Sequence, residues 1–362
     1  MSTENGAGAE TVGGATLAVV VVSYNVRQLL RACLGATLAS LARSSFVLTG
    51  PENGPRAADD RPRAATVIVV DNASADGSAA MVAAECPQVQ LIASPQNLGF
   101  AAGNNLALRR LGFADVAQAA PPAAHGARRA MHGPQYVLLL NPDAEPIADA
   151  IGQMADFLAD HPAVGGVGAQ LQYPDGRFQH GAFRFPDLWQ LWFDFFPPRP
   201  RRLLESRLNG RYAPKRYAAG QPFPIDFALG AALMVRREAI AAAGLLDEGY
   251  FMYAEEVDWC WRIQRAGWPF YCVPAARVIH HGGASTRQFR AQSFLNLWRS
   301  RKRLYDRFYA PGRRRLAGLI VRLGMMAEIA RVRAAVAGGA LDADEAATRL
   351  AAAREVYALF AR

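Results

Sequence analysis

The stretch ATLAVVVVSYN, Ala15 to Asn25, decides the fold of this chain. Residues 15–22 are continuously apolar and rich in β-branched valine, which is typical of a strand buried on both faces of a parallel sheet. A polar turn follows at once, and apolar residues then recur at helical spacing from Leu29 to Leu41. The stretch therefore predicts a β-strand that leads through a polar turn into an α-helix.

The same alternation continues along the chain. Further short apolar runs predict strands at Thr66 to Val70, Val89 to Ala93 and Tyr136 to Leu140, and a helix is predicted at Ser78 to Glu85. Strands that alternate with helices predict a parallel α/β sheet with right-handed crossovers. Residues 42–65 and 114–133, rich in Ala, Pro, Gly and Arg, interrupt the alternation and predict surface loops or local disorder.

The overall composition indicates a globular protein with a large core. With 362 residues, 51% of them apolar, the chain can form one large domain or one domain with an appendage. The four cysteines show no CxxC spacing, so we expect reduced core thiols and neither a zinc site nor disulfides. Residues 1–14 lack the features of a signal peptide, and no stretch reaches the ~18 apolar residues of a membrane span. We therefore expect a disordered N-terminus and a cytoplasmic protein.

Positive charge is concentrated at the C-terminal end. The formal net charge is +9, and from Arg287 onward sixteen Lys or Arg stand against six Asp or Glu. From about Gln292 the chain is predicted to be mostly helical, with a last helix begun by Asp342 or Asp344. In residues 313–326 a basic cluster precedes an apolar helical face. This face fits either contact with an anionic membrane surface or packing on the rest of the chain or on another subunit of a homo-oligomer.

Polar side chains follow the predicted strands where each one ends. These residues are Ser23, Tyr24 and Asn25; Asp71 and Asn72; the loop from Asn97 to Asn104; and Asn141, Pro142 and Asp143. Each group alone is typical of an ordinary turn. Ligands of open α/β sheets bind beyond the carboxyl ends of the strands, so the four groups together predict a binding edge.

The kind of ligand is narrowed by what this edge lacks. Neither GxGxxG nor GxxxxGK[ST] follows the first strand, which excludes a Rossmann dinucleotide site and a P-loop. Asp143, supported by a remote histidine, suits a hard divalent cation that bridges a diphosphate. Asp71 and Asn72 suit the edge of a nucleobase.

Seven motifs, taken together, resemble those of family 2 glycosyltransferases. They are VVVVSYN, VVDNASADGS, NLGFAAGNN, LLLNPDA, FALGAALMVRR, EEVDWCWR and VIHHGGAS, in the order and approximate spacing of that family. The resemblance covers about Ala15 to Arg303 and is greatest to the bacterial rhamnosyltransferase-like branch. It implies a GT-A fold, a Rossmann-like α/β architecture with a mostly parallel sheet flanked by helices. It also implies a metal-dependent, inverting sugar transfer in the cytoplasm.

The resemblance also implies a division of the chain. A GT-A catalytic domain would span residues 15–290, with a nucleotide-sugar half at about 15–145 and an acceptor half at about 146–290. A basic helical extension, residues 291–362, would follow.

The resemblance assigns donor-binding roles to residues in matching positions. Ser23, Tyr24 and Asn25 would line the base and ribose, and Asp71, beside Asn72, would accept a hydrogen bond from a pyrimidine N3–H. Asn97, Gly99, Gly103 and Asn104 would form the loop near the ribose and diphosphate. Gly230, in a predicted buried strand at Phe227 to Arg237, would lie beneath the donor sugar, although packing alone also explains a glycine there.

A metal site follows from the same resemblance. Asp143 matches the last Asp of the family's DxD motif, and Asn141 replaces the first, as is common in this branch. His280 matches a distal histidine that completes the shell around Mg²⁺ or Mn²⁺, and the adjacent His281 leaves the register open by one residue.

Chemistry is expected at EEVDWCWR. An inverting transfer needs a carboxylate to take the acceptor proton, and the matching position is Glu256, where most relatives have Asp. Glu255 would orient acceptor hydroxyls. Asp258 either contacts the acceptor or pairs with Arg262 at i,i+4. Trp259 and Trp261 are expected in the core, with Phe251 and Tyr253 in the wall of the acceptor cleft.

Several functions remain open at this point. The first candidate donor is dTDP-rhamnose, by resemblance alone, and a UDP-hexose would use the same residues. The acceptor would be a glycan or a lipid-linked saccharide in cell-envelope polysaccharide synthesis, at the inner face of the membrane. Alternatives are a nucleotide-sugar-binding protein without catalysis and a nucleic-acid binder. Nucleic acid is disfavoured because the positive charge is confined to the tail and no reading motif accompanies it.

Overall fold

The structure is a computed structural model that describes residues 16–49, 63–114, 133–282 and 290–361. The predicted disorder of residues 1–14 and the middle of both predicted loops lie outside the described residues. The strands are β1 Leu17–Ser23, β2 Val47–Leu48, β3 Ala64–Asp71, β4 Gln90–Ala93, β5 Tyr136–Leu140, β6 Ala144–Pro146, β7 Gly166–Gln172, β8 Phe178–Gln179, β9 Ala182–Phe183, β10 Phe223–Ile225, β11 Phe227–Ala228, β12 Ala232–Arg236 and β13 Phe270–His280. The helices are α1 Arg27–Arg43, α2 Ser78–Glu85, α3 Gly99–Arg110, α4 Ala150–Asp160, α5 Leu188–Phe195, α6 Pro214–Ala218, α7 Arg237–Ala243, α8 Glu255–Arg265, α9 Arg290–Phe308, α10 Pro311–Ala337 and α11 Ala343–Leu359, with short 3₁₀ turns η2 Arg201–Glu205 and η3 Arg207–Asn209.

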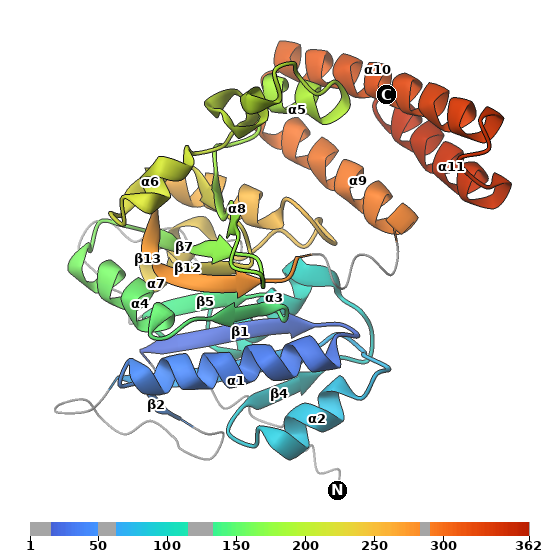
Figure 1. The fold of residues 1–362 in the computed structure, drawn as a ribbon. Helices are drawn as coiled ribbons and strands as arrows, with labels where there is room; N and C mark the ends of the chain where they lie inside the picture. Colours follow the sequence, from blue (N-terminus) through green and yellow to red (C-terminus); the bar gives the residue numbers. More distant parts are fainter. Residues whose placement is uncertain (1–15, 50–62, 115–132, 283–289, 362) are drawn as a thin grey trace, which may run out of the picture.

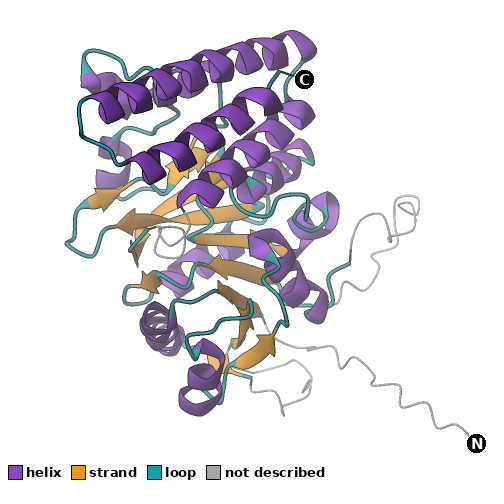
Figure 2. Ribbon diagram, turned by 90° about the vertical axis from the view of Figure 1, so that its right-hand side faces the viewer, coloured by secondary structure: helices purple, strands orange, loops and turns teal. Residues whose placement is uncertain are grey.

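A central sheet runs through the molecule in the order β10-β13-β7-β12-β5-β1-β3-β2, with β4 also paired to β3 (Figure 1). Helices cover both sides of this sheet (Figure 2). The predicted strands and the α2 helix are confirmed within about two residues at their ends. In the described part of the predicted loop at residues 42–65, residues 47–48 form a short strand, β2, which pairs with the start of β3.

The sheet is buried on both faces, as its apolar runs predict. All seven residues of β1 are buried. Ala18, Val20 and Val22 belong to the core on one face, and the alternate residues Leu17 and Val19 belong to the core on the other. The four cysteines are buried and free, which confirms the prediction of core thiols.

The parallel register brings the polar strand ends to one edge. Ser23 at the end of β1 lies beside Asp71 at the end of β3. On the other side of β1, Val21 lies beside Leu140, so Asn141 leaves β5 at nearly the same level. The convergence predicted from the sequence is therefore a feature of the fold.

The second half of the sheet departs from the expected parallel arrangement. β12 is antiparallel to both β5 and β7, whereas β13 is parallel to β7. The predicted single strand at residues 227–237 is instead two strands, because β11 pairs with β9 in a separate sheet and β12 belongs to the central sheet; Arg237 begins α7. The fold is α/β as expected, with a parallel sheet in the first half and a mixed sheet in the second.

Three C-terminal helices lie together at one end of the molecule, next to α5 (Figure 1). Asp342 caps α11 by accepting hydrogen bonds from the backbone of Asp344 and Glu345, which decides between the two predicted starts. The α9 helix is tied to the sheet domain by ion pairs of Arg303 and Arg307 with Asp247. Helix α9, the first of the C-terminal helices, is therefore fixed to the sheet domain.

Candidate functional site

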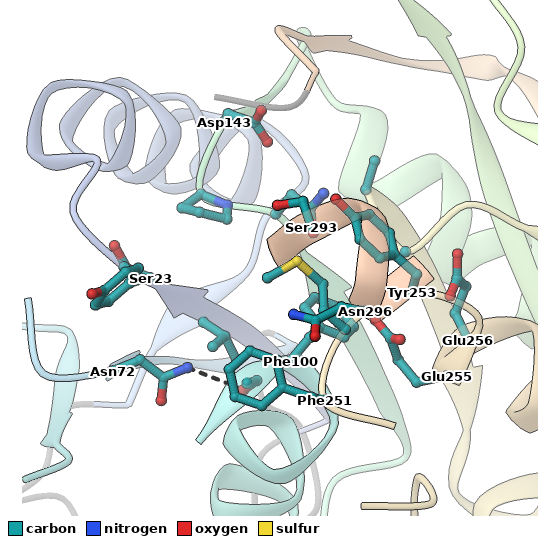
Figure 3. A pocket seen from close by; sticks show the side chains of 18 of the residues that line it. Ser23, Asn72, Phe100, Asp143, Phe251, Tyr253, Glu255, Glu256, Ser293 and Asn296 are labelled. Carbon is teal, nitrogen blue, oxygen red and sulfur yellow. Dashed lines mark hydrogen bonds between the residues drawn. The ribbon is translucent and has the colours of Figure 1, made fainter. Parts of the chain in front are cut away.

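A cavity of about 470 Å³ opens at the polar edge of the sheet. Ser23 and Asn72 lie on one side of it, and Glu255 and Glu256 lie on the other (Figure 3). The predicted residues that line the cavity are Ser23, Tyr24, Asn72, Asn97, Gly99, Asn141, Asp143, Gly230, Phe251, Tyr253, Glu255, Glu256 and His280. The other predicted residues lie outside the lining: Asn25, Asp71, Gly103, Asn104 and Asp258.

The strand-end side of the cavity carries buried polar atoms without partners. The Ser23 hydroxyl, Asp71 Oδ1 and Asn72 Oδ1 are buried and have no hydrogen-bond partner among the described residues. Their neighbours are held in place, since Asn72 Nδ2 donates to the Gly99 carbonyl at 3.0 Å and Asp71 Oδ2 accepts from the Ser74 backbone at 3.0 Å. A buried polar atom without a partner costs stability, so this side is prepared for a polar ligand.

Asn25 has a different position from its neighbours. Its backbone has a positive φ of 52°, and its Oδ1 accepts from the backbone N–H of Ala75 at 2.8 Å. Its own backbone N–H donates to the Ser74 hydroxyl at 3.0 Å. Asn25 therefore joins the turns after β1 and β3 and supports the cavity from outside its lining.

The turn into α3 is shaped by glycine. Gly99 has a φ of 78°, and a Cβ on it would lie 2.2 Å from the Phe251 carbonyl oxygen, so a larger residue would be excluded. Asn97 Oδ1 accepts from the Gly99 backbone at 2.9 Å, which holds the turn. Farther along α3, Gly103 packs against Val22, and Asn104 donates to the Phe100 carbonyl. Gly103 and Asn104 therefore support the wall of the cavity from behind.

Asp143 and His280 come together at the end of β5 and the end of β13. His280 Nε2 lies 3.5 Å from Asp143 Oδ1 and 3.5 Å from Asn141 Nδ2, and both Asp143 and His280 are buried. His281 instead contacts Glu145, with Nε2 2.8 Å from Oε1. The structure thus brings the imidazole of His280, and not that of His281, beside the Asp143 carboxylate, while the His281 backbone N–H donates to the Asp143 carbonyl at 3.0 Å.

These groups are few for a metal cage built from protein alone. Within the described part of the chain, no three His, Cys, Asp or Glu side chains converge as metal ligands. One carboxylate and one imidazole that face an open cavity do fit a cation that takes its other ligands from phosphate oxygens and water. The donor set is therefore suited to an ion that arrives with its diphosphate.

The opposite side of the cavity contains two buried glutamates at the start of α8. Burial raises the pKa of Glu255 well above its ordinary value, and the adjacent Glu256 raises it further. Burial also raises the pKa of Glu256, while backbone N–H groups, including that of Gly230, oppose part of the shift. One oxygen of each carboxyl group has no hydrogen-bond partner among the residues described. Such carboxyl groups can accept a proton from a substrate hydroxyl.

Asp258 has the second of its two predicted roles. Its Oδ1 accepts from Arg262 Nε at 2.6 Å, and its Oδ2 lies 3.1 Å from Arg307 Nη1 and accepts from the Tyr250 hydroxyl at 3.2 Å. The side chain is fully buried, and Asp258 does not line the cavity. Asp258 therefore joins α8 to α9.

The aromatic residues of α8 are packed as expected. Trp259 is fully buried and donates its indole N–H to the Gly244 carbonyl at 2.8 Å. Trp261 is stacked between Phe185 and Phe308, at centroid distances of 4.2 and 4.4 Å. Both rings serve the core and the contact between α8 and α9.

Three polar cavity residues, all from α9, were not among those predicted. Gln292, Ser293 and Asn296 come from the first turns of α9, and Figure 3 shows Ser293 and Asn296 between the two sides of the cavity. Gln292 Nε2 donates to Asn296 Oδ1 at 2.9 Å. The sequence shows these three residues only as polar positions i, i+1 and i+4 of a predicted helix. That pattern does not by itself indicate that they line a cavity formed by distant segments.

One family model and two known proteins match the sequence, and all three are glycosyltransferases. The sequence profile described as Glycosyl transferase family 2 matches residues 18–111. The chain is 30% identical over 234 residues to an N-acetylglucosaminyl-diphospho-decaprenol L-rhamnosyltransferase of Mycobacterium tuberculosis, which covers 63% of this chain and 70% of that protein. It is 34% identical over 70 residues to the rhamnosyltransferase WbbL of Escherichia coli, covering 19% of this chain and 26% of WbbL.

Among solved structures, a mannosyltransferase of Pyrobaculum calidifontis with GDP-Man and Mn²⁺ aligns with a TM-score of 0.49 and 18% identity. That alignment covers 97% of this chain and 87% of the mannosyltransferase.

Proposed function

The chain belongs to glycosyltransferase family 2, and on that premise we propose that it transfers a sugar from a nucleoside diphosphate to an acceptor hydroxyl with inversion. One observation carries the proposal. A single cavity joins a polar strand-end edge, where buried oxygens of Ser23 and Asn72 have no partner in the described part of the chain, to two buried glutamates with raised pKa values. The two sides supply what a donor nucleotide and a nucleophilic hydroxyl each require.

The donor is proposed to bind at the strand-end side. Asp71 Oδ1, buried just behind the cavity lining, is proposed to accept the hydrogen bond of a pyrimidine N3–H, with Asn72 next to it and Ser23 and Tyr24 beside the base and ribose. The mycobacterial relative is named an L-rhamnosyltransferase, which supports dTDP-rhamnose as the first donor to test. A UDP-hexose is the alternative donor.

A divalent cation, Mg²⁺ or Mn²⁺, is proposed to be held by Asp143 and His280, with Asn141 beside them. When bound, such a cation would stabilise the negative charge that develops on the leaving diphosphate. Both side chains are buried and line the cavity.

Glu256 is proposed as the general base. Its carboxylate would take the proton of the acceptor hydroxyl as the hydroxyl oxygen bonds to the anomeric carbon and the bond from that carbon to the diphosphate breaks. A raised pKa makes the carboxylate a stronger base, and burial excludes water that would compete with the acceptor. The electron pair of the broken bond leaves with the nucleoside diphosphate.

The acceptor is proposed to lie between Glu255, Tyr253 and the start of α9. Glu255 would orient acceptor hydroxyls, and Asn296 of α9 presents an amide to the same cavity. The name of the mycobacterial relative describes a lipid-linked saccharide as its substrate, which supports a lipid-linked or glycan acceptor here. The proposed compartment is the cytoplasm, at the inner face of the cell membrane, in cell-envelope polysaccharide synthesis.

The test is a screen of nucleotide sugars by thermal shift, with and without Mg²⁺ or Mn²⁺. At about one hundred times its Kd, a specific donor should stabilise the fold by ~2.7 kcal/mol and raise the melting temperature by several degrees. The donor that binds is then assayed for release of its nucleoside diphosphate in the presence of acceptor saccharides. Stabilisation by no nucleotide sugar, with or without metal, would contradict the proposed function.

A further inference from the structure

Helix α10 has two opposite apolar faces, and one of them is exposed. Ala317, Val321 and Met325 are buried against the rest of the C-terminal region. On the other face lies the α10 stripe, which we define as Leu316, Leu319, Leu323 and Met326. These side chains are 41–55% exposed and recur every three or four residues, so they form one continuous row along the helix.

The α10 stripe is bordered by positive charge. Helix α10 contains six arginines and one acidic residue, Glu328, which pairs with Arg331 and Arg349. Arg313, Arg314 and Arg315 precede the stripe and are exposed. An exposed apolar row bordered by arginines is the pattern of a helix that lies in the surface of an anionic membrane.

Helix α5 lies beside α10 at the same end of the molecule (Figure 1). It packs on α10, where Phe195 fills the space beside Gly324, and it exposes Trp189 by 58% and Trp192 by 38%. The short 3₁₀ turns that follow α5 add three exposed arginines, Arg201, Arg202 and Arg207, at this end of the molecule (Figure 1). Tryptophan, with its large apolar ring and polar N–H, favours the boundary between water and lipid.

The positive charge of this surface distinguishes between two possible partners, a second copy of the chain and an anionic membrane. A second copy of the chain would place arginine-rich borders against each other, which is unfavourable, whereas anionic headgroups would neutralise them. Among residues 16–49, 63–114, 133–282 and 290–361, no helix is long and apolar enough to cross a bilayer. We propose that the α10 stripe, with the exposed tryptophans of α5, binds in the surface of an anionic phospholipid bilayer.

The α10 stripe is connected to the cavity through helices α9 and α11. Helix α9 lines the cavity with its first turns and is fixed to the cavity loop by Ser300, whose hydroxyl donates to the Met252 carbonyl at 2.8 Å. The same helix packs on α11, which packs on α10. Docking would therefore hold the cavity in a set position relative to the membrane. The membrane proposal does not depend on the identity of the donor or on catalysis.

The experiment is flotation of the full chain with vesicles of phosphatidylcholine alone or of phosphatidylcholine with phosphatidylglycerol, without donor or acceptor. We expect binding to the anionic vesicles that weakens as salt is raised. The double variant Leu319→Gln/Leu323→Gln should lower the partition coefficient about tenfold or more, because two apolar side chains are lost from the lipid contact. Arg315→Gln should lower it by about fivefold.

The matched control is Val47→Gln, which removes a similarly exposed apolar side chain from β2, far from α10. It should bind vesicles as the wild type does, and all variants should keep the wild-type melting temperature within about two degrees. Equal binding of the double variant and the wild type, or no binding of the wild type to anionic vesicles at low salt, would overturn the proposal. Self-association in sedimentation that Leu319→Gln/Leu323→Gln abolishes, without vesicle binding, would assign the surface to a second copy instead.

Discussion

Helix α8 buries three carboxyl groups in its first turn, and their surroundings differ. Glu255 and Glu256 face the cavity, with one oxygen of each lacking a partner within the described residues. Asp258, two residues later, faces α9 and contacts Arg262, Arg307 and Tyr250. Carboxyl groups that are similarly buried in one helix therefore lie in two different environments.

The difference can be explained by the energetics of buried charge. A buried carboxylate is tolerated when paired, and a buried group without a partner raises its pKa instead. Asp258 has the surroundings of a structural ion pair, whereas Glu255 and Glu256 have those of groups that exchange protons with a ligand. The predictions below test this difference, from the largest expected effect to the smallest.

The largest effect is expected at the proposed base. Glu256→Gln should lower kcat by about 10²–10⁴-fold, because the amide cannot take the acceptor proton. Donor binding by thermal shift should remain, since Glu256 lies on the opposite side of the cavity from Ser23 and Asn72. Transfer at the wild-type rate would reject Glu256 as the base.

Next is the loss of the paired carboxylate. Asp258→Asn leaves Arg262 and Arg307 without their buried partner, and we expect the free energy of unfolding to fall by about 3–5 kcal/mol. Denaturant unfolding measures this change. Asp175→Asn is the control, because Asp175 pairs with Arg177 on the surface, and its loss should leave the free energy of unfolding nearly unchanged. Equal losses in the two variants would remove the distinction between the carboxylates.

Glu255→Gln should change stability in the opposite direction. A carboxyl group whose pKa is raised by folding destabilises the fold as pH rises above its unfolded pKa of about 4.3. The amide has no such dependence, so the variant should gain on the order of 1 kcal/mol over the wild type at pH 7 and little at pH 4. Denaturant unfolding at both pH values checks the sign, and a variant less stable at pH 7 than at pH 4, relative to wild type, would contradict it.

The pH dependence of sugar transfer tests whether the Glu256 carboxyl group is buried. Because the pKa of Glu256 is raised, kcat/KM should increase with pH through a midpoint above that of an ordinary glutamate, about 4.3. Initial rates from pH 4 to 8 measure the midpoint. A plateau already reached at pH 5 would indicate that the base is not in a desolvated site.

The smallest effect is expected on α9. Asn296→Ala removes one amide from the cavity, and the KM for acceptor should rise severalfold, with the donor Kd unchanged. Gln292→Ala should act in the same direction, since Gln292 donates to Asn296. An unchanged acceptor KM in both variants would place the acceptor elsewhere.

Local patterns in the sequence predicted much of this structure. The apolar runs of β1, β3 and β5 predicted buried parallel strands, and the polar residues after them predicted a common edge, because parallel strands end at the same side of a sheet. Helical spacing also offered the pairing of Asp258 with Arg262 as one of two roles for Asp258, and the structure contains that pair. These features depend on periodicity and on near neighbours in the chain.

Other features required the tertiary structure. The antiparallel insertion of β12 and the choice of His280 over His281 depend on how β5, β7 and β13 meet. Asn296 enters the cavity because α9 packs beside α8. None of these contacts joins neighbours in sequence.

For the acidic cluster of α8, the sequence by itself determined that Glu255, Glu256 and Asp258 fall within four positions, with Asp258 four residues before Arg262. The tertiary structure decided which of them is paired, because Arg307 reaches Asp258 from a helix some fifty residues farther along the chain, while the glutamates face the cavity. Helical spacing is local, but the partner and the solvent of a buried charge are set by packing between distant segments.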